Sequence, residues 1–233
     1  MEITIPTKLS EVPLYQLIEY NQVDTENDTQ RAIYATAIFL GLTHKETAKL
    51  PLKVLNKAIG HIKNILNESP QLTQIFTHKG VKYGFVPNLD ELTTGEFIDI
   101  ENYQKEPKDL YKVMSVLYRP VTEVQKKRYK IASYKGEVNE SFKDMASDVA
   151  VGAQLFFYHI ANELLTYSQK YLEAKKAKQT NTDLTKSGDG WALSIYSLME
   201  MSQSLTQLVK HPFKQISCGR LTNRTWGSWK EKL

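Results

Sequence analysis

The chain has 233 residues, of which 41% are hydrophobic and 24% charged, so it has enough apolar material for a sizeable globular core. Its single cysteine, Cys218, excludes an intramolecular disulfide and gives no indication of an oxidising compartment. The most apolar stretch, Val149–Ala161, is shorter than the about 20 residues of a membrane-spanning helix, and the first residues lack the pattern of a signal peptide. We therefore expect a protein that is neither embedded in a membrane nor secreted by a standard signal.

The net charge of +4 is unevenly distributed along the chain. Residues Thr166–Leu233 contain 11 Lys and Arg against 5 Asp and Glu, a balance of +6, which leaves −2 for the first 165 residues. A basic C-terminal region next to a faintly acidic body is typical of a region that binds an acidic partner, either protein or nucleic acid. It is equally typical of a charged region that faces solvent and binds no partner.

Helices are predicted for the first third of the chain. One begins after an N-cap at Ser10 and continues to about Gln22, and a second over Arg31–Leu40 ends at Gly41.

Two further helices follow directly. Thr43, with Glu46 three residues later, is a capping-box pattern that begins a short helix. Pro51 is suited to the start of the next helix, and apolar residues at helical spacing predict it over Leu52–Leu66.

The middle of the chain changes to a β pattern. Gln74–Thr77 and Val81–Phe85 are rich in β-branched and aromatic residues, and Gly80 between them supplies a positive φ, which predicts a β-hairpin. The basic stretch Val121–Glu137 is interpreted as irregular, with a candidate third strand at Tyr129–Ala132.

Three more helices are predicted by apolar spacing, over Thr94–Tyr103, Lys108–Tyr118 and Met145–Leu172. The segment Val149–Leu165 is apolar on nearly all sides in its first half, so we expect it to be the most buried element. The expected fold class is therefore α+β and mainly helical, with a compact helical body, a small antiparallel sheet and a C-terminal helical extension.

Three regions are expected: the helical body over 1–172 with its hairpin near 74–85, a polar linker over 173–190, and an amphipathic helix with a basic aromatic tail over 191–233. The helix, Trp191–Lys210, has a broad apolar stripe that must be buried. It either folds back onto the body or packs against another subunit, with Trp226 and Trp229 as anchors, and the second alternative is preferred.

Aromatic and basic side chains of this last region are the candidate partner-binding residues. Rings that stack on bases and cations that meet phosphates are typical of single-strand binding, whereas tryptophans that fill pockets are typical of protein docking. Docking is the preferred interpretation. The candidate residues are Trp191, Arg220, Arg224, Trp226 and Trp229.

Signatures of catalysis are absent from the sequence, which contains no phosphate-binding glycine loop, no HExxH, no GxSxG and no kinase elements. His159 and Glu163 share a helix face, but two ligands do not make a metal site. Acidic residues gather at Asp90, Glu91, Glu96, Asp99 and Glu101, where helix capping or a charged contact surface is favoured over cation binding or acid–base chemistry. We expect no enzyme, no cofactor and no metal.

Several segments carry a family resemblance: ITIPTKLSEVPLYQL, VKYGFVPNLDELTTGEFIDIENY, DLYKVMSVLYRPV and DVAVGAQLFFYHIANELL. Over Ile3–Leu165 the chain resembles a family of uncharacterised virion-morphogenesis proteins of tailed bacteriophages, including phages of gut Bacteroides-type hosts. The resemblance implies a structural or assembly role in the tail, neck or head and carries over no catalytic residues.

From this we expect an oligomer or part of a larger assembly, located in the virion or in the host cytoplasm during assembly, with other virion or assembly proteins as partners. The alternative is a nucleic-acid-binding accessory protein that uses its basic C-terminal third. A third hypothesis is an enzyme with an unfamiliar site around Asp99 and Glu101.

Overall fold

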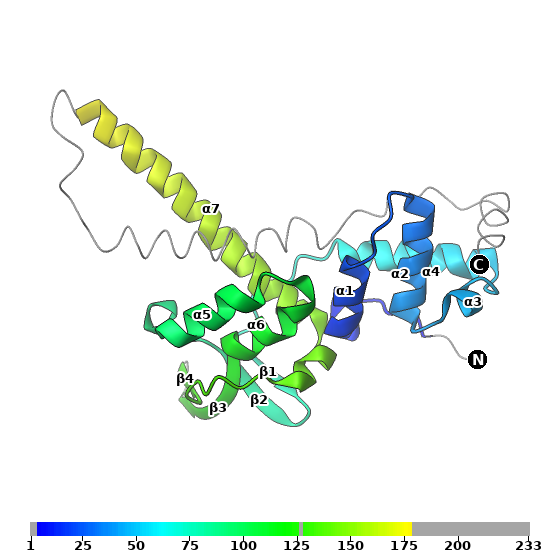
Figure 1. Ribbon diagram of the computed structural model, residues 1–233, viewed down its shortest axis with the longest axis horizontal. Helices are drawn as coiled ribbons and strands as arrows, with labels where there is room; N and C mark the ends of the chain where they lie inside the picture. Colours follow the sequence, from blue (N-terminus) through cyan, green and yellow to red (C-terminus); the bar gives the residue numbers. More distant parts are fainter. Residues whose placement is uncertain (1–3, 126–127, 179–233) are drawn as a thin grey trace.

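The computed structural model describes residues 4–125 and 128–178 (Figure 1). Within these residues the fold is α+β and mainly helical, as predicted, with seven α-helices and one antiparallel sheet of four strands. Helices α1 to α4 form one lobe, which we call the helical lobe, and the sheet with α5 and α6 forms a second, the sheet lobe (Figure 1). Helix α7 contacts α6 and also α1, so it belongs to both.

The helical lobe contains α1 (Leu14–Asn21), α2 (Asp28–Leu40), α3 (His44–Thr47) and α4 (Leu52–Leu66). Helix α2 contacts both α1 and α4. Apolar side chains recur at helical spacing on the longer helices, and their burial against one another forms the core of the lobe.

The predicted helix boundaries in this lobe are largely confirmed. Gly41 ends α2 in the left-handed conformation, with φ of 62°, and Thr43 and Glu46 make the reciprocal hydrogen bonds of a capping box. Helix α4 has the predicted bounds. Helix α2 begins three residues before the predicted start because the side chain of Asn27 accepts a hydrogen bond from the backbone N–H of Gln30.

The prediction of an N-cap at Ser10 is wrong. Leu9–Glu11 is a short 3-10 helix, and α1 starts only at Leu14. Between them the chain is extended because it pairs with a distant segment: the N–H of Leu14 donates to the carbonyl of Met145, and the N–H of Ser147 donates to the carbonyl of Val12. This long-range pairing outweighs the local capping signal.

The sheet has the order β1-β2-β3-β4 with β1 (Ile75–His78), β2 (Val81–Phe85), β3 (Tyr118–Gln125) and β4 (Arg128–Ile131), and each pair of neighbours is antiparallel. The predicted hairpin is confirmed, and so is the candidate strand near Tyr129. The hairpin turn has positive φ at Lys79 and Gly80, 46° and 81°, which is the geometry that two-residue hairpins favour.

Strand β3 was not predicted, because its residues were assigned to the end of the helix over Lys108–Tyr118 and to the irregular stretch Val121–Glu137. Pro120 has no N–H to donate, yet it lies within β3 opposite Tyr83, and its carbonyl accepts a hydrogen bond from the N–H of Ala132. A register irregularity between Val121 and Glu123 follows it. The segment expected to be irregular therefore supplies a central strand.

Helices α5 (Thr94–Tyr103) and α6 (Leu110–Leu117) pack against each other. Seven of the eight residues of α6 are buried, whereas α7 is buried continuously only from Val149 to Gln154 and is exposed at His159. The expectation that Val149–Leu165 is the most buried element is therefore wrong. Helix α6 is buried on nearly all sides because it also contacts β3, α7 and the turn at 140–144.

Aromatic rings fill the space between the sheet and these helices. Phe142 lies 4.9 Å from Tyr83 and 5.9 Å from Phe76, ring centre to ring centre, and Phe85 lies 5.6 Å from Phe156 of α7. Edge-to-face pairs of this kind add about 0.5–1.5 kcal/mol beyond the area they bury. The pair of Phe85 and Phe156 attaches α7 to the sheet, and the Phe142 pairs attach the turn at 140–144. The short 3-10 turns of the fold are η1 (Leu9–Glu11), η2 (Leu89–Glu91), η3 (Pro107–Asp109) and η4 (Glu140–Asp144).

Helix α7 (Ser147–Lys178) continues past its predicted end at Leu172. Residues 173–178, EAKKAK, were expected to begin the linker, but Glu, Ala and Lys are all strong helix formers, so the helix extends through them. In Figure 1 the helix leaves the body after its first turns and extends away from it. None of the helices in residues 4–125 and 128–178 combines the length and apolarity that a bilayer span requires.

Replacing Gly152 of α7 tests its close approach to the loop after α4. A Cβ at this position would lie 2.4 Å from the carbonyl oxygen of Gln71, which is backbone and cannot rotate away. We expect Gly152→Ala to lower the free energy of unfolding by about 1–3 kcal/mol, measured by urea denaturation.

Gly60→Ala is the matched control, since Gly60 is also helical but has nothing within 4 Å of its ideal Cβ. This variant should gain about 0.5–1 kcal/mol from the better helix propensity of alanine. Equal effects of the two substitutions would contradict the close contact.

Candidate functional site

The sheet lobe contains a pocket of about 370 Å³ between β2, the end of α6, the start of β3 and the segment after β4. Such a volume lies within the range of small-ligand sites. We call it the Arg119 pocket. Its lining combines aromatic, charged and small side chains: Tyr83, Ser115, Tyr118, Arg119, Pro120, Ala132, Ser133, Tyr134, Lys135, Glu137, Val138 and Asn139.

Arg119 in this pocket is paired with a buried carboxylate. Its Nη1 lies 2.7 Å from Oε1 of Glu96, and Glu96 is only 2% exposed. The other carboxylate oxygen of Glu96 accepts hydrogen bonds from the N–H and the hydroxyl of Thr93, both 2.7 Å long, in the capping box that begins α5. One side chain therefore caps α5 and neutralises the guanidinium on β3.

Tyr134 connects the segment after β4 to α5. Its hydroxyl donates a 2.5 Å hydrogen bond to Oδ2 of Asp99. Burial raises the pKa of the Tyr134 phenol well above its ordinary value, and the hydrogen bond to the Asp99 carboxylate raises that pKa further. The phenol is therefore protonated at neutral pH, where it serves as a hydrogen-bond donor and not as a base.

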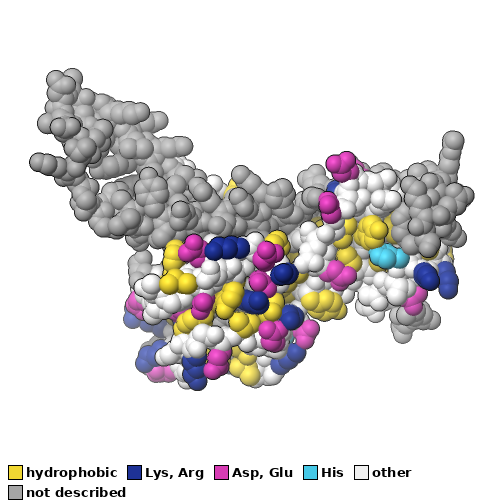
Figure 2. All heavy atoms as spheres, viewed as in Figure 1, with side chains coloured by type: hydrophobic (Ala, Val, Ile, Leu, Met, Phe, Trp, Pro, Cys, Tyr) yellow, Lys and Arg dark blue, Asp and Glu magenta, His cyan; other side chains and the backbone are white. Residues whose placement is uncertain are grey.

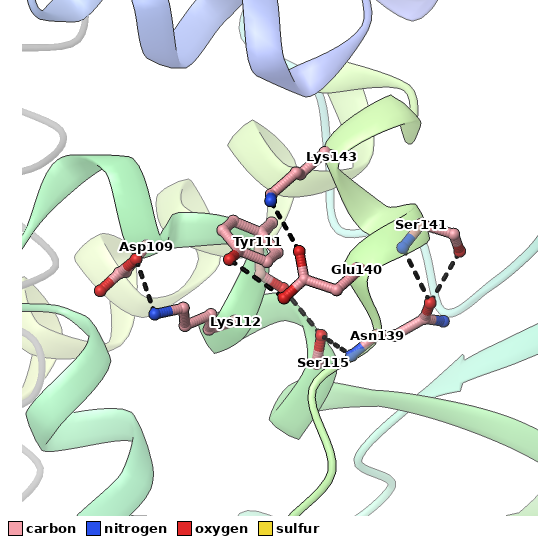
Figure 3. A network of polar contacts seen from close by, with 8 residues as sticks. All are labelled: Asp109, Tyr111, Lys112, Ser115, Asn139, Glu140, Ser141 and Lys143. Carbon is pink, nitrogen blue, oxygen red and sulfur yellow. Dashed lines mark hydrogen bonds and ion pairs between the residues drawn. The ribbon is translucent and has the colours of Figure 1, made fainter.

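Asn139 organises the opposite wall of the pocket. Its Nδ2 donates to the hydroxyl of Tyr83 at 3.0 Å, and its Oδ1 accepts from both the N–H and the hydroxyl of Ser141. Its own N–H donates to Ser115, whose hydroxyl in turn donates to the carbonyl of Tyr111. Figure 3 shows the contacts of Asn139 with Ser115 of α6 and with Ser141 of η4. The Ser115 hydroxyl therefore accepts one hydrogen bond and donates another, both to backbone groups.

A charged group continues this network towards the surface (Figure 3). Glu140 lies between Lys143, 2.6 Å away, and the hydroxyl of Tyr111, and the ammonium of Lys143 lies 4.6 Å from the centre of the Tyr111 ring. The hydrogen bond from Lys143 lowers the pKa of the Glu140 carboxyl, and the same contact raises the pKa of Lys143. On α6, Lys112 pairs with Asp109 at 2.9 Å.

The acidic residues singled out in the sequence are dispersed by the fold. Glu96 caps a helix as expected, and Asp99 accepts from Tyr134. Glu91 accepts from the side chain of Asn88, Glu101 is exposed, and the side chain of Asp90 is outside the described residues. Helix capping thus accounts for Glu96.

Metal-ligating side chains do not gather within the part of the chain that the structure describes, where no three His, Cys, Asp or Glu lie together. His159 is exposed on α7, and the side chain of its sequence partner Glu163 is not among those described. His78 contacts the carbonyl of Ser141 through Nε2, at 2.9 Å.

The predicted partner-binding residues, Trp191, Arg220, Arg224, Trp226 and Trp229, all lie outside the described residues. Conversely, the Arg119 pocket was not anticipated. Its residues come from β2, α6, β3 and the segment 132–139, which are far apart in the sequence and carry no shared motif. Only the antiparallel pairing of β3 with β2 and β4 brings them together.

Comparison with known proteins found no matching family model, no matching curated protein and no matching solved structure.

Replacing Glu96 by glutamine tests its double role. Gln retains hydrogen-bonding groups for the capping box but leaves the largely buried guanidinium of Arg119 without a counter-charge. We expect Glu96→Gln to cost about 1.5–3 kcal/mol of unfolding free energy, the range for a hydrogen bond that involves a charged group.

Glu46→Gln is the matched control, because Glu46 holds the same capping-box position in α3, is less buried than Glu96, and forms no ion pair within the described residues. The difference in unfolding free energy between the two variants measures the contribution of the ion pair between Glu96 and Arg119. If both substitutions cost the same in chemical denaturation, the ion pair contributes nothing to stability.

Proposed function

We propose that this chain is a non-enzymatic structural or assembly protein of tailed bacteriophages, which acts through protein–protein contacts with other virion components of the tail, neck or head. The observation that carries the proposal is the extension of α7 from a body in which Glu96, Asp99 and the other polar groups best placed near the pocket hold internal contacts.

The extension of α7 is suited to contacts outside the body. The helix is buried where it meets the aromatic core, up to Phe157, and its side chains at His159, Asn162 and Thr166 are exposed. From His159 to Lys178 the helical backbone covers about 30 Å, at about 1.5 Å per residue. A helix anchored at one end and extended at the other presents a surface at a distance from its body, which a compact enzyme has no need of.

The polar groups of the sheet lobe support the same proposal. Glu96, Asp99, Ser115 and Asn139, the groups best placed for chemistry near the pocket, each have partners that fix α5, α6 or the segment 132–139. On the face shown in Figure 2, Lys and Arg side chains are interspersed with Asp and Glu over the sheet lobe. This mixed charge is typical of a surface for specific protein contacts more than of a surface for a polyanion.

The resemblance of Ile3–Leu165 to virion-morphogenesis proteins supplies the biological setting for the proposal. Its segments fall on the elements that build the body: the start of α1, the β2–α5 region, α6 with β3, and the first half of α7. A fold alone is compatible with many functions, so the assignment to phage assembly is tested in the phage itself.

The test is an amber codon at Lys8 in a phage that carries this gene, grown on suppressing and non-suppressing hosts. We expect the non-suppressing host to replicate phage DNA normally, measured by quantitative PCR, and to accumulate incomplete particles, seen by negative-stain electron microscopy. A normal yield of complete, infectious particles without the protein would overturn the proposal.

A nucleic-acid-binding function is distinguished by its salt dependence. If the full chain contacts phosphates through its basic C-terminal third, the logarithm of its affinity for a DNA fragment falls with the logarithm of salt with a slope of about −0.9 per contact. For an assembly protein we expect weak binding and a shallow slope. Tight, steeply salt-dependent binding, together with lost DNA replication in the amber phage, would favour the accessory protein.

A further inference from the structure

Helix α4 and the short helix α3 before it carry a run of lysines on the surface of the helical lobe. Between His44 and Asn64 the sequence has five lysines and one acidic residue, Glu46. All five lysines are exposed, and none of them forms an ion pair within residues 4–125 and 128–178. We call them the lysine patch: Lys45, Lys49, Lys53, Lys57 and Lys63.

The charge of the lysine patch contrasts with that of the rest of the body. With Glu46 counted, the segment from His44 to Asn64 has a balance of +4, whereas the first 165 residues together have −2, so the others among them carry −6. Figure 2 shows basic side chains at the end of the helical lobe where Figure 1 labels α3. A surface with charge of one sign attracts an anionic partner.

The exposed side of α4 is a continuous row. Lys53, Lys57, Gly60 and Asn64 are separated by four, three and four residues, so helix geometry places them on one face, and all four are exposed. No acidic residue interrupts α4. The opposite face is packed in the core through Leu55, Ala58, Ile59, Ile62, Ile65 and Leu66.

Two residues of this row lower the stability of the helix without an internal reason. Lys53 lies in the first turn, at the positive end of the helix dipole, where α4 has no acidic residue and no side-chain cap. Gly60 is a poor helix former in the interior of a helix of 15 residues, and its ideal Cβ would have nothing within 4 Å beyond the helix itself. Both residues suit an external anion, which Lys53 would attract and the missing Cβ would admit.

A chain of phosphates fits this row better than an acidic protein surface does. Protein interfaces are centred on apolar or aromatic anchors and are depleted of lysine, and the exposed row has no large apolar side chain. Along the helix axis Lys53 and Lys57 are about 6 Å apart and Lys63 about 9 Å further, at about 1.5 Å per residue. Over such a length a DNA strand presents several phosphates, one for about every 3.4 Å of its axis.

We propose that the exposed face of α4, with the lysine patch, binds the phosphate backbone of double-stranded DNA without sequence preference. Lys53, Lys57 and Lys63 pair with phosphates, and Gly60 lets one strand lie against the helix backbone. The row has no aromatic ring on which unpaired bases could stack, so the partner is the duplex and not a single strand. Contacts of this kind position a protein on DNA but carry no base information.

This surface is separate from the basic C-terminal region. The helix expected over Trp191–Lys210 and the tail after it lie outside the described residues, so the inference rests on the helical lobe alone. Weak, sequence-independent binding to DNA is compatible with an assembly protein and needs no role in replication. The inference goes beyond the proposed role in phage assembly, and since it is tested on the purified protein, either can fail without the other.

The test removes the lysines of α4 from the full chain in the variant Lys53→Gln with Lys57→Gln and Lys63→Gln. All three side chains are exposed and without ion pairs within the described residues, so circular dichroism should match that of the parent. Binding to a fluorescent duplex of mixed sequence is measured by anisotropy over a series of salt concentrations. Because each phosphate contact contributes about −0.9, we expect a log–log slope shallower than the parent's by about 2.7, and at low salt an affinity lower by roughly tenfold or more.

The matched control is Lys82→Gln with Lys105→Gln and Lys135→Gln, which changes the net charge equally at three exposed lysines of the sheet lobe that also lack ion pairs within the described residues. Its slope should match that of the parent. Equal slopes of the two triple variants, or a parent that ignores the duplex, would overturn the proposal. Binding to phosphatidylglycerol vesicles in place of the duplex would assign the lysines to a membrane surface and overturn it too.

Gly60→Leu tests the close approach of the strand separately. Leucine is a good helix former, so this variant should unfold at a higher urea concentration than the parent. Its side chain would hold the duplex away from the helix, so we expect the affinity for the duplex to fall several-fold although the protein is more stable. A stabilised variant that binds the duplex as well as the parent does would overturn the close approach at Gly60.

Discussion

The architecture depends on how the first turns of α7 are held between the two lobes. The N–H of Leu14 donates to the carbonyl of Met145 and the N–H of Ser147 donates to the carbonyl of Val12, so the entry to α7 is hydrogen-bonded to the entry to α1. Further along the helix, the absence of a Cβ at Gly152 lets it lie directly on the carbonyl of Gln71. These contacts join segments that are far apart in the sequence, and they set the direction in which the remainder of α7 leaves the body.

The buried charges of the sheet lobe also depend on contacts between segments that are far apart in the sequence. Glu96 is almost fully buried, and a carboxylate in that position is tolerated because two donors of Thr93 and the guanidinium of Arg119 compensate for its lost hydration. The pair fixes α5 against β3 in one orientation, and Tyr134 adds a second link to α5 through Asp99. The pocket between these groups is therefore surrounded by side chains that stabilise the fold.

A helical extension gives a simple physical basis for the proposed role in assembly. A body held together by an aromatic core can present a rigid projection only if the projection's own apolar surface is covered, because an isolated amphipathic helix is marginal in water.

The sequence by itself determined those features that rest on local interactions. The capping box of Thr43 and Glu46, the left-handed Gly41, the bounds of α4 and the hairpin turn at Gly80 all depend on neighbours a few residues away. Tertiary structure decided the rest. Pro120 lies inside a strand because β2 and β4 pair on either side of it, the Ser10 cap is lost because Val12 pairs with Ser147, and Glu96 meets Arg119 only after α5 packs against the sheet. No local pattern encodes these contacts, since the free energy that favours them comes from burial and pairing between segments that approach each other only in the folded chain.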